Sequence, residues 1–221
     1  MATRGGGEES GVDLPRLPPG RHGLSRDFVV ENQRQRIAAG MIQVVVEAGY
    51  TAATVTEVVA AAKVSRRTFY NYYGDKREAF LDVYGQVADF ICGAMEEAGE
   101  AERGGWAARV RAELAALLGC FGANQDLVRF SLVAPPAAGG DVAGAYRDFL
   151  ERILRILRDG RPKSSRQPPP ASEYGLVGGL AALIVAALDN HSGSLDALLP
   201  EVTELVLTPY LGRDAAARAA H

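Results

Sequence analysis

The chain has 221 residues, of which 48% are hydrophobic and 23% charged, and its net charge is −3. This composition supplies one or two compact domains with buried cores and excludes a disordered chain. No secretory signal opens the sequence, no apolar run reaches the roughly 18 residues that span a bilayer, and the two cysteines are isolated, so we expect a cytoplasmic protein.

The charge is unevenly distributed along the sequence. Residues 14–80 carry 10 basic and 6 acidic side chains, whereas residues 81–221 carry 13 basic and 18 acidic ones. A basic first third on an acidic remainder is typical of a nucleic-acid-binding head on a separate body, although ordinary scatter of charge can give the same difference.

The first 75 residues divide into an arm and three helices. Residues 1–26 are rich in Gly, Pro and Arg without periodicity, which predicts a flexible arm. Apolar residues at helical spacing predict a first helix from Asp27, which ends at Gly49. Thr54 can cap a short second helix, and Ser65 can cap a third that ends at Gly74. We therefore expect a head over residues 27–75.

The rest of the chain is also predicted to be helical. Asp75 with Glu78 resembles a capping box that opens a connecting helix over residues 76–97. In the body, residues 98–221, we expect a short helix stopped by Pro135–Pro136, an exposed loop over residues 160–170, an apolar helix, and a last helix with Pro200 in its first turn. No convincing strand pattern occurs, so the predicted fold class is all-α.

The third predicted helix has two distinct faces. Phe69 and Tyr73 share the side toward the core, while Arg67, Thr68 and Asn71 lie on the opposite side. A short apolar helix, a tight turn and a second helix with polar and basic side chains are the plan of a helix-turn-helix, here over about residues 54–73. The alternative is an ordinary surface helix whose rings pack on a neighbour.

Residues 50–80 resemble the N-terminal domain of the tetracycline-repressor (TetR) family of bacterial transcriptional regulators. The resemblance rests on Gly49-Tyr50, Thr54-Val55, Val64-Ser65, Thr68-Phe69-Tyr70, Tyr73 and Asp75-Lys76. It implies a homodimeric DNA-binding regulator, most often a repressor released by a small molecule. The residues expected at the DNA are Thr54, Ser65, Arg66, Arg67, Thr68, Tyr70, Asn71, Tyr72 and Lys76, with Lys76 on a phosphate.

Two residues depart from the family pattern. Lys63 occupies the turn where the family usually has Gly, so either a left-handed conformation costs it about 1–2 kcal/mol or the turn takes another shape. Tyr73 stands where Phe is usual, and its additional hydroxyl needs water or a partner.

The body is expected to bind a largely apolar inducer and a second copy of the chain. A cavity is predicted among Trp106, Leu117, Phe121, Phe130, Tyr146 and Phe149, although such residues equally form an ordinary core. Residues 172–190 and 200–211 are predicted to form the dimer contact. In the connecting helix, Phe80, Val83, Tyr84 and Val87 should face the head, and Phe90, Ile91 and Met95 the body.

Other sequence features give weaker hypotheses. Arg16, Arg21 and Arg26 in the arm can follow a minor groove or belong to a solvated tail. The three histidines, at 22, 191 and 221, lack metal-ligand spacing, so we expect no metal, cofactor or enzymatic activity. The competing interpretation is an all-α small-molecule-binding protein or enzyme whose N-terminal helices merely resemble the motif.

Overall fold

The computed structural model describes residues 26–190 and 194–221, and these contain helices and no strands. The predicted arm, with Arg16, Arg21 and His22, therefore lies outside the described residues, as does His191. The helices are α1 (Arg26–Ala52), α2 (Val55–Ala61), α3 (Arg66–Tyr70), α4 (Lys76–Ala101), α5 (Trp106–Ala123), α6 (Gln125–Val128), the π-helix η1 (Arg129–Val133), α7 (Ala134–Ala138), α8 (Gly140–Arg158), α9 (Pro170–Asp189), the 3₁₀-helix η2 (Leu195–Leu198), α10 (Leu199–Leu211) and α11 (Arg213–Ala220).

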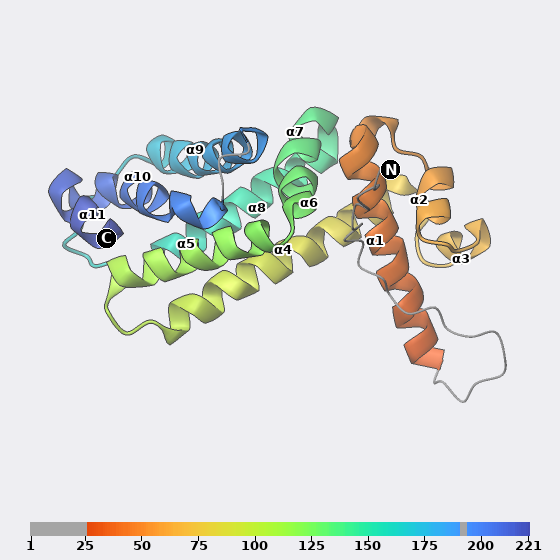
Figure 1. Ribbon diagram of the computed structural model, residues 1–221, viewed down its shortest axis with the longest axis horizontal. Helices are drawn as coiled ribbons and strands as arrows, with labels where there is room; N and C mark the ends of the chain where they lie inside the picture. Colours follow the sequence, from red (N-terminus) through yellow and green to blue (C-terminus); the bar gives the residue numbers. More distant parts are fainter. Residues whose placement is uncertain (1–25, 191–193) are drawn as a thin grey trace, which may run out of the picture.

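Helices α1, α2 and α3 form a head at one end of the molecule, and α4 runs from this head along the body (Figure 1). Ile37, Met41, Val58 and Phe69 are fully buried in the head, as the helical spacing predicts. Gly40 brings α1 close to α2, because a Cβ at this position would lie 2.7 Å from the backbone nitrogen of Ala62. A side chain at residue 40 would push the two helices apart.

The regular part of α1 ends at Gly49, in agreement with the sequence. Gly49 has a φ of 79°, a conformation that a residue with a Cβ rarely adopts. The backbone then makes one more helical turn, closed by a 3.1 Å hydrogen bond from Ala53 N–H to the Gly49 carbonyl. The kink directs Tyr50 toward α4, where its ring meets Phe80 edge-on at 4.7 Å.

The body consists of α5 to α11 together with most of α4. Helix α5 packs along α4, α8 packs on α4 and α9, and α10 lies beside α5, α9 and α11 (Figure 1). The chain leaves α8 through residues 159–169, close to the predicted exposed loop. Pro200 lies in the first turn of α10 as expected, but α10 is not the last helix, because α11 follows it.

Three expectations about the body are wrong. Pro135 and Pro136 do not stop a helix but lie in the first turn of α7, where their missing N–H groups cost nothing. Phe90 does not pack on the body, since 61% of its surface is exposed. Helix α9 alone among the described residues is long and apolar enough to cross a membrane by length and composition, although no run of that length was expected.

Candidate nucleic-acid interface and ligand cavity

The turn between α2 and α3 takes the left-handed conformation that the sequence raised as one of two possibilities. Lys63 has a φ of 54°, the one positive value among the described non-glycine residues. Its N–H donates to the Ala60 carbonyl and the Val64 N–H to the Val59 carbonyl, each at 3.1 Å, which is the Schellman pattern at a helix end. The Arg36 guanidinium donates to the Lys63 carbonyl and holds the turn against α1.

Both helices of the motif begin at the predicted caps. The Thr54 hydroxyl accepts from the Glu57 N–H, and the Glu57 carboxylate accepts in return from the Thr54 N–H at 2.9 Å, a complete capping box. Hydrogen bonds from the Thr54 side chain and backbone lower the pKa of Glu57. At α3 the Ser65 hydroxyl accepts from the Thr68 N–H at 2.9 Å. These caps fix where α3 starts and therefore which side chains its first turn presents.

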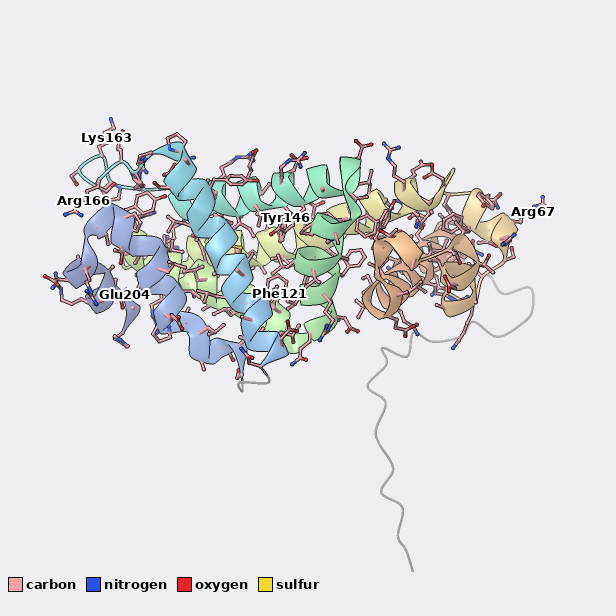
Figure 2. The ribbon with its side chains drawn as sticks, turned by 90° about the horizontal axis from the view of Figure 1, so that it is seen from above. Arg67, Phe121, Tyr146, Lys163, Arg166 and Glu204 are labelled. Carbon is pink, nitrogen blue, oxygen red and sulfur yellow. The ribbon has the colours of Figure 1, made fainter. Side chains whose placement is uncertain are left out.

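The outer face of α3 is basic and polar. Arg67 is exposed and lies at the end of the molecule remote from α11 (Figure 2). Arg66 is also exposed, and its guanidinium donates to the Thr56 hydroxyl of α2. Tyr70 is 55% exposed, and Asn71 is exposed at the end of α3. The structure thus brings most of the predicted DNA-contacting residues to one surface.

Lys76 has a different environment from the one predicted. Its ammonium group donates to the Tyr50 carbonyl at 2.8 Å and the Ala53 carbonyl at 2.7 Å, and it lies 4.5 Å from the centre of the Tyr50 ring. A third carbonyl, that of Thr51, is 3.4 Å away. Because an ammonium has three hydrogens, these carbonyls occupy it, and Lys76 ties α4 to the end of α1 in this conformation rather than offering a free charge.

The two tyrosines that follow α3 hold the head together. Tyr72, expected at the DNA, is half-buried and donates to the Gln33 side chain at 2.8 Å. The Tyr73 hydroxyl finds the partner that the sequence required, because it donates to Asp82 at 2.7 Å. Burial, with the bond to Asp82, raises the pKa of Tyr73 to about 12. Asp82 also accepts from Arg34 at 3.1 Å, which links α1, α4 and the segment after α3.

A chain of aromatic contacts connects the head to the body. Phe80 of α4 packs against Tyr50 of α1 and, at 5.1 Å between ring centres, against Phe130 of η1. Tyr84 donates to the Ser131 carbonyl of the same π-helix at 3.0 Å. Phe80 and Tyr84 were expected to face the head. Phe80 contacts both the head and the body, whereas Tyr84 contacts Phe130 and Ser131 of the body. The π-helix, a form often found at functional sites, is therefore in contact with the head.

The body contains a small apolar cavity between α5, α8 and α9. Its volume is about 10 Å³, room for about one water molecule, and it is lined only by apolar side chains. They are Leu117, Phe121, Leu132, Leu150, Ile153, Val177, Leu180, Ala181 and Ile184. Leu132 belongs to η1, so the same π-helix contacts both this cavity and the head.

Only two of the six side chains predicted to form a pocket, Leu117 and Phe121, line this cavity. Trp106 instead donates to the Leu157 carbonyl at 3.0 Å and packs on Tyr210. Phe130 and Phe149 both pack around Tyr84. Tyr146 is half-buried in α8 and labelled in Figure 2. Aliphatic residues of α8 and α9, which the sequence could not distinguish from ordinary core, form most of the lining.

These features define a class of protein. Two short capped helices joined by a tight turn, with an exposed basic second helix on an all-α body, constitute a helix-turn-helix DNA-binding protein.

Comparison with known proteins gives a family match for the head. The family model of bacterial regulatory proteins of the tetR family matches residues 38–83, which cover the helix-turn-helix and the start of α4. A search of curated protein sequences finds no match. Whole-chain similarity is found among solved structures at low sequence identity.

Three of these structures illustrate the likeness. The transcriptional regulator FadR from Bacillus subtilis, in complex with stearoyl-CoA, has a TM-score of 0.70 at 15% identity over 79% of this chain and 98% of that chain. The fatty acid degradation regulator FadR from Bacillus halodurans has a TM-score of 0.66 at 18% identity, over 78% of this chain and 97% of that chain. A TetR family transcription regulator from Marinobacter aquaeolei VT8 has a TM-score of 0.69 at 16% identity, over 83% of this chain and 98% of that chain. The protein is thus a DNA-binding transcriptional regulator whose head matches the tetR family of bacterial regulatory proteins, and its chain has the fold of these solved structures.

Proposed function

We propose that the protein is a cytoplasmic, homodimeric repressor that leaves a near-palindromic operator when a largely apolar small molecule enters its body. The observation that carries this proposal is the position of η1. Its Leu132 borders the apolar cavity, its Phe130 packs on Phe80 of α4, and its Ser131 carbonyl holds Tyr84. A ligand that displaces η1 therefore acts on α4, which carries the head.

The cavity must open before any ligand enters, because about 10 Å³ accommodates no molecule larger than water. A ligand can shift the equilibrium between two conformations only by as much as it prefers one of them. The closed cavity between α5, α8 and α9 supports a simple scheme with two conformations. The unliganded conformation binds DNA, and the liganded, opened conformation moves α4 and lowers the affinity for DNA.

The proposed dimer contact involves α9 and α10, within the predicted residues 172–190 and 200–211. The outward side of α9 has small residues, among them Gly175, Ala182 and Ala186, which are exposed in the single chain. Gly179 faces Leu205 of α10 at the limit of contact, 4.0 Å from a Cβ position, so the two helices can present one joint surface. A second copy packed there would form a four-helix contact with two-fold symmetry.

The experiment that tests the proposal starts with selection of bound duplexes from a genomic library, followed by operator binding measured for Arg67→Ala. We expect this variant to lose about 1–3 kcal/mol of binding free energy on the selected site and to become less selective at one base pair. Arg147→Ala, on the exposed side of α8, is the matched control and should bind like wild type. If wild type selects no sequence, or if Arg67→Ala binds the site unchanged, the proposal is wrong.

A further inference from the structure

One side of α9 joins the apolar cavity to a buried carboxylate. Val177, Leu180, Ala181 and Ile184 line the cavity, and Glu173 lies one helical turn before Val177 on the same stripe. Glu173 is only 1% exposed. The apolar seam between α5, α8 and α9 thus ends at a charged group, and a ligand extending along it would meet that group.

Two arginines and a tyrosine surround this carboxylate. Arg158, at the end of α8, donates to Glu173 at 2.5 Å, and Arg161 donates at 3.2 Å from the following loop. The Tyr210 hydroxyl of α10 donates at 2.8 Å. We call Arg158, Arg161, Tyr210 and Glu173 the carboxylate clamp. A buried carboxylate is stable in protein only with partners of this kind.

The carboxylate clamp has two guanidinium groups for the single carboxylate of Glu173. The Arg158 side chain is 44% exposed and that of Arg161 21%, so both guanidinium groups reach the surface. The nearby Asp159 is paired at 2.8 Å with Arg109, which also pairs with Glu113 of α5. Lys163 and Arg166, on the same loop and at the end of the molecule opposite Arg67 (Figure 2), are exposed and add further positive charge.

We propose that the ligand of this seam is an aliphatic chain with an anionic head group. The chain lies between α5, α8 and α9, and the head group binds the guanidinium groups of Arg158 and Arg161 in place of Glu173. The wholly apolar lining favours hydrocarbon, and paired arginines favour a carboxylate or a phosphate over a neutral group. This inference rests on the proposed function, since it names the ligand of that same site.

The geometry also explains why an anion is needed. A chain that parts α9 from α5 and α8 must disturb Glu173, because Glu173 lies on the lining face of α9. Leaving two partly buried guanidinium groups without a carboxylate is costly, and an anionic head removes that cost whereas a neutral one does not. An uncharged molecule with the same chain should therefore open the seam far less readily.

The test compares dodecanoate, dodecanol and dodecyl phosphate as probes, with binding to the full chain followed by titration calorimetry. We expect dodecanoate to bind wild type roughly tenfold or more tightly than dodecanol, as a charge-assisted hydrogen bond provides. Glu173→Gln should bind dodecanoate several-fold more tightly than wild type, because the competing carboxylate is gone. The double variant Arg158→Gln, Glu173→Gln should lose the preference for the acid, and Arg147→Gln, a matched exposed arginine of α8, should keep it.

Each result bears on the inference. Equal binding of acid and alcohol to wild type, which requires no variant to fold, overturns it, and so does a double variant that keeps the preference. Dodecyl phosphate binding more tightly than dodecanoate identifies a phosphate-bearing head, and the reverse order identifies a free carboxylate. If the protein binds a selected operator, but neither anion binds the protein or releases it from the operator, this inference alone fails. Failure to select any operator refutes the proposed function.

Discussion

A buried carboxylate in α5 makes the stability of this protein depend on pH. Glu113 is fully buried; its Oε1 accepts from Arg109 at 2.8 Å, and its Oε2 has no partner among the described residues. Burial, opposed by Arg109 and reinforced by Asp159 and Glu96, raises the pKa of Glu113 from 4.5 to about 7. The folded protein therefore binds this proton more tightly than the unfolded chain does.

The sign and size of the effect follow from this difference in pKa. Because the folded-state pKa is raised, the stabilisation is fully present below the unfolded pKa near 4.5 and is lost as pH rises through about 7. A shift of this size corresponds to about 3 kcal/mol of unfolding free energy. Glu113→Gln keeps the shape of the side chain and does not ionise. The free energy of unfolding of this variant should therefore lack the loss that ionisation of Glu113 causes in wild type as pH rises.

The assay is urea unfolding of wild type and Glu113→Gln between about pH 5 and about pH 8.5, at one protein concentration because dimerisation adds to stability. We expect the variant to gain up to about 3 kcal/mol relative to wild type as pH rises. Glu97→Gln, on the exposed side of α4, controls for general charge effects. A difference between Glu113→Gln and wild type that stays constant with pH would refute the reasoning.

Three further substitutions test the head. Gly40→Ala should cost about 1–3 kcal/mol of unfolding free energy through overpacking against α2. Gly85→Ala should stabilise α4, because the space around Gly85 is open. Thermal unfolding should therefore show a lower melting temperature for the first variant and a higher one for the second. Lys63→Gly should raise the stability by about 1 kcal/mol, since glycine adopts the left-handed turn without strain, and an unchanged melting temperature would argue against strain there. Lys76→Met should lower the free energy of unfolding, measured in urea without DNA, because it removes the carbonyl contacts at the end of α1. A loss of DNA affinity without a loss of stability would instead favour the predicted phosphate contact.

The head could be predicted from the sequence because its signals are local. Caps at Thr54, Ser65 and Asp75 and apolar residues at helical spacing fix the short helices of this region, and the burial of Phe69 and Tyr73 follows from the same spacing. The carbonyl contacts of Lys76 could not be predicted because the partners are some 25 residues away and leave no trace in the local pattern.

The body was predicted less well because its features depend on packing between distant segments. The clustering of aromatic residues suggested a pocket, but Phe130 and Phe149 join the contacts around Tyr84, and aliphatic side chains line the cavity instead. Phe90 falls near the buried side of α4 by periodicity, yet no element covers it. The carboxylate clamp likewise joins α8, a loop, α9 and α10, so no single stretch of sequence indicates it.

The length of α4 determines how far the head moves when α4 tilts. Its 26 residues make a rod of about 39 Å, at about 1.5 Å per residue, held at one end against α5 and joined to the head at the other. A tilt of only about 5° about the far end would carry the head about 3.4 Å, the rise of one base pair. In the proposed dimer, the two heads would have to reach major grooves about 34–36 Å apart, and each head would then be displaced by about one base pair. In the proposed mechanism, a small tilt of α4 would thus be enough to prevent the heads from binding two successive major grooves.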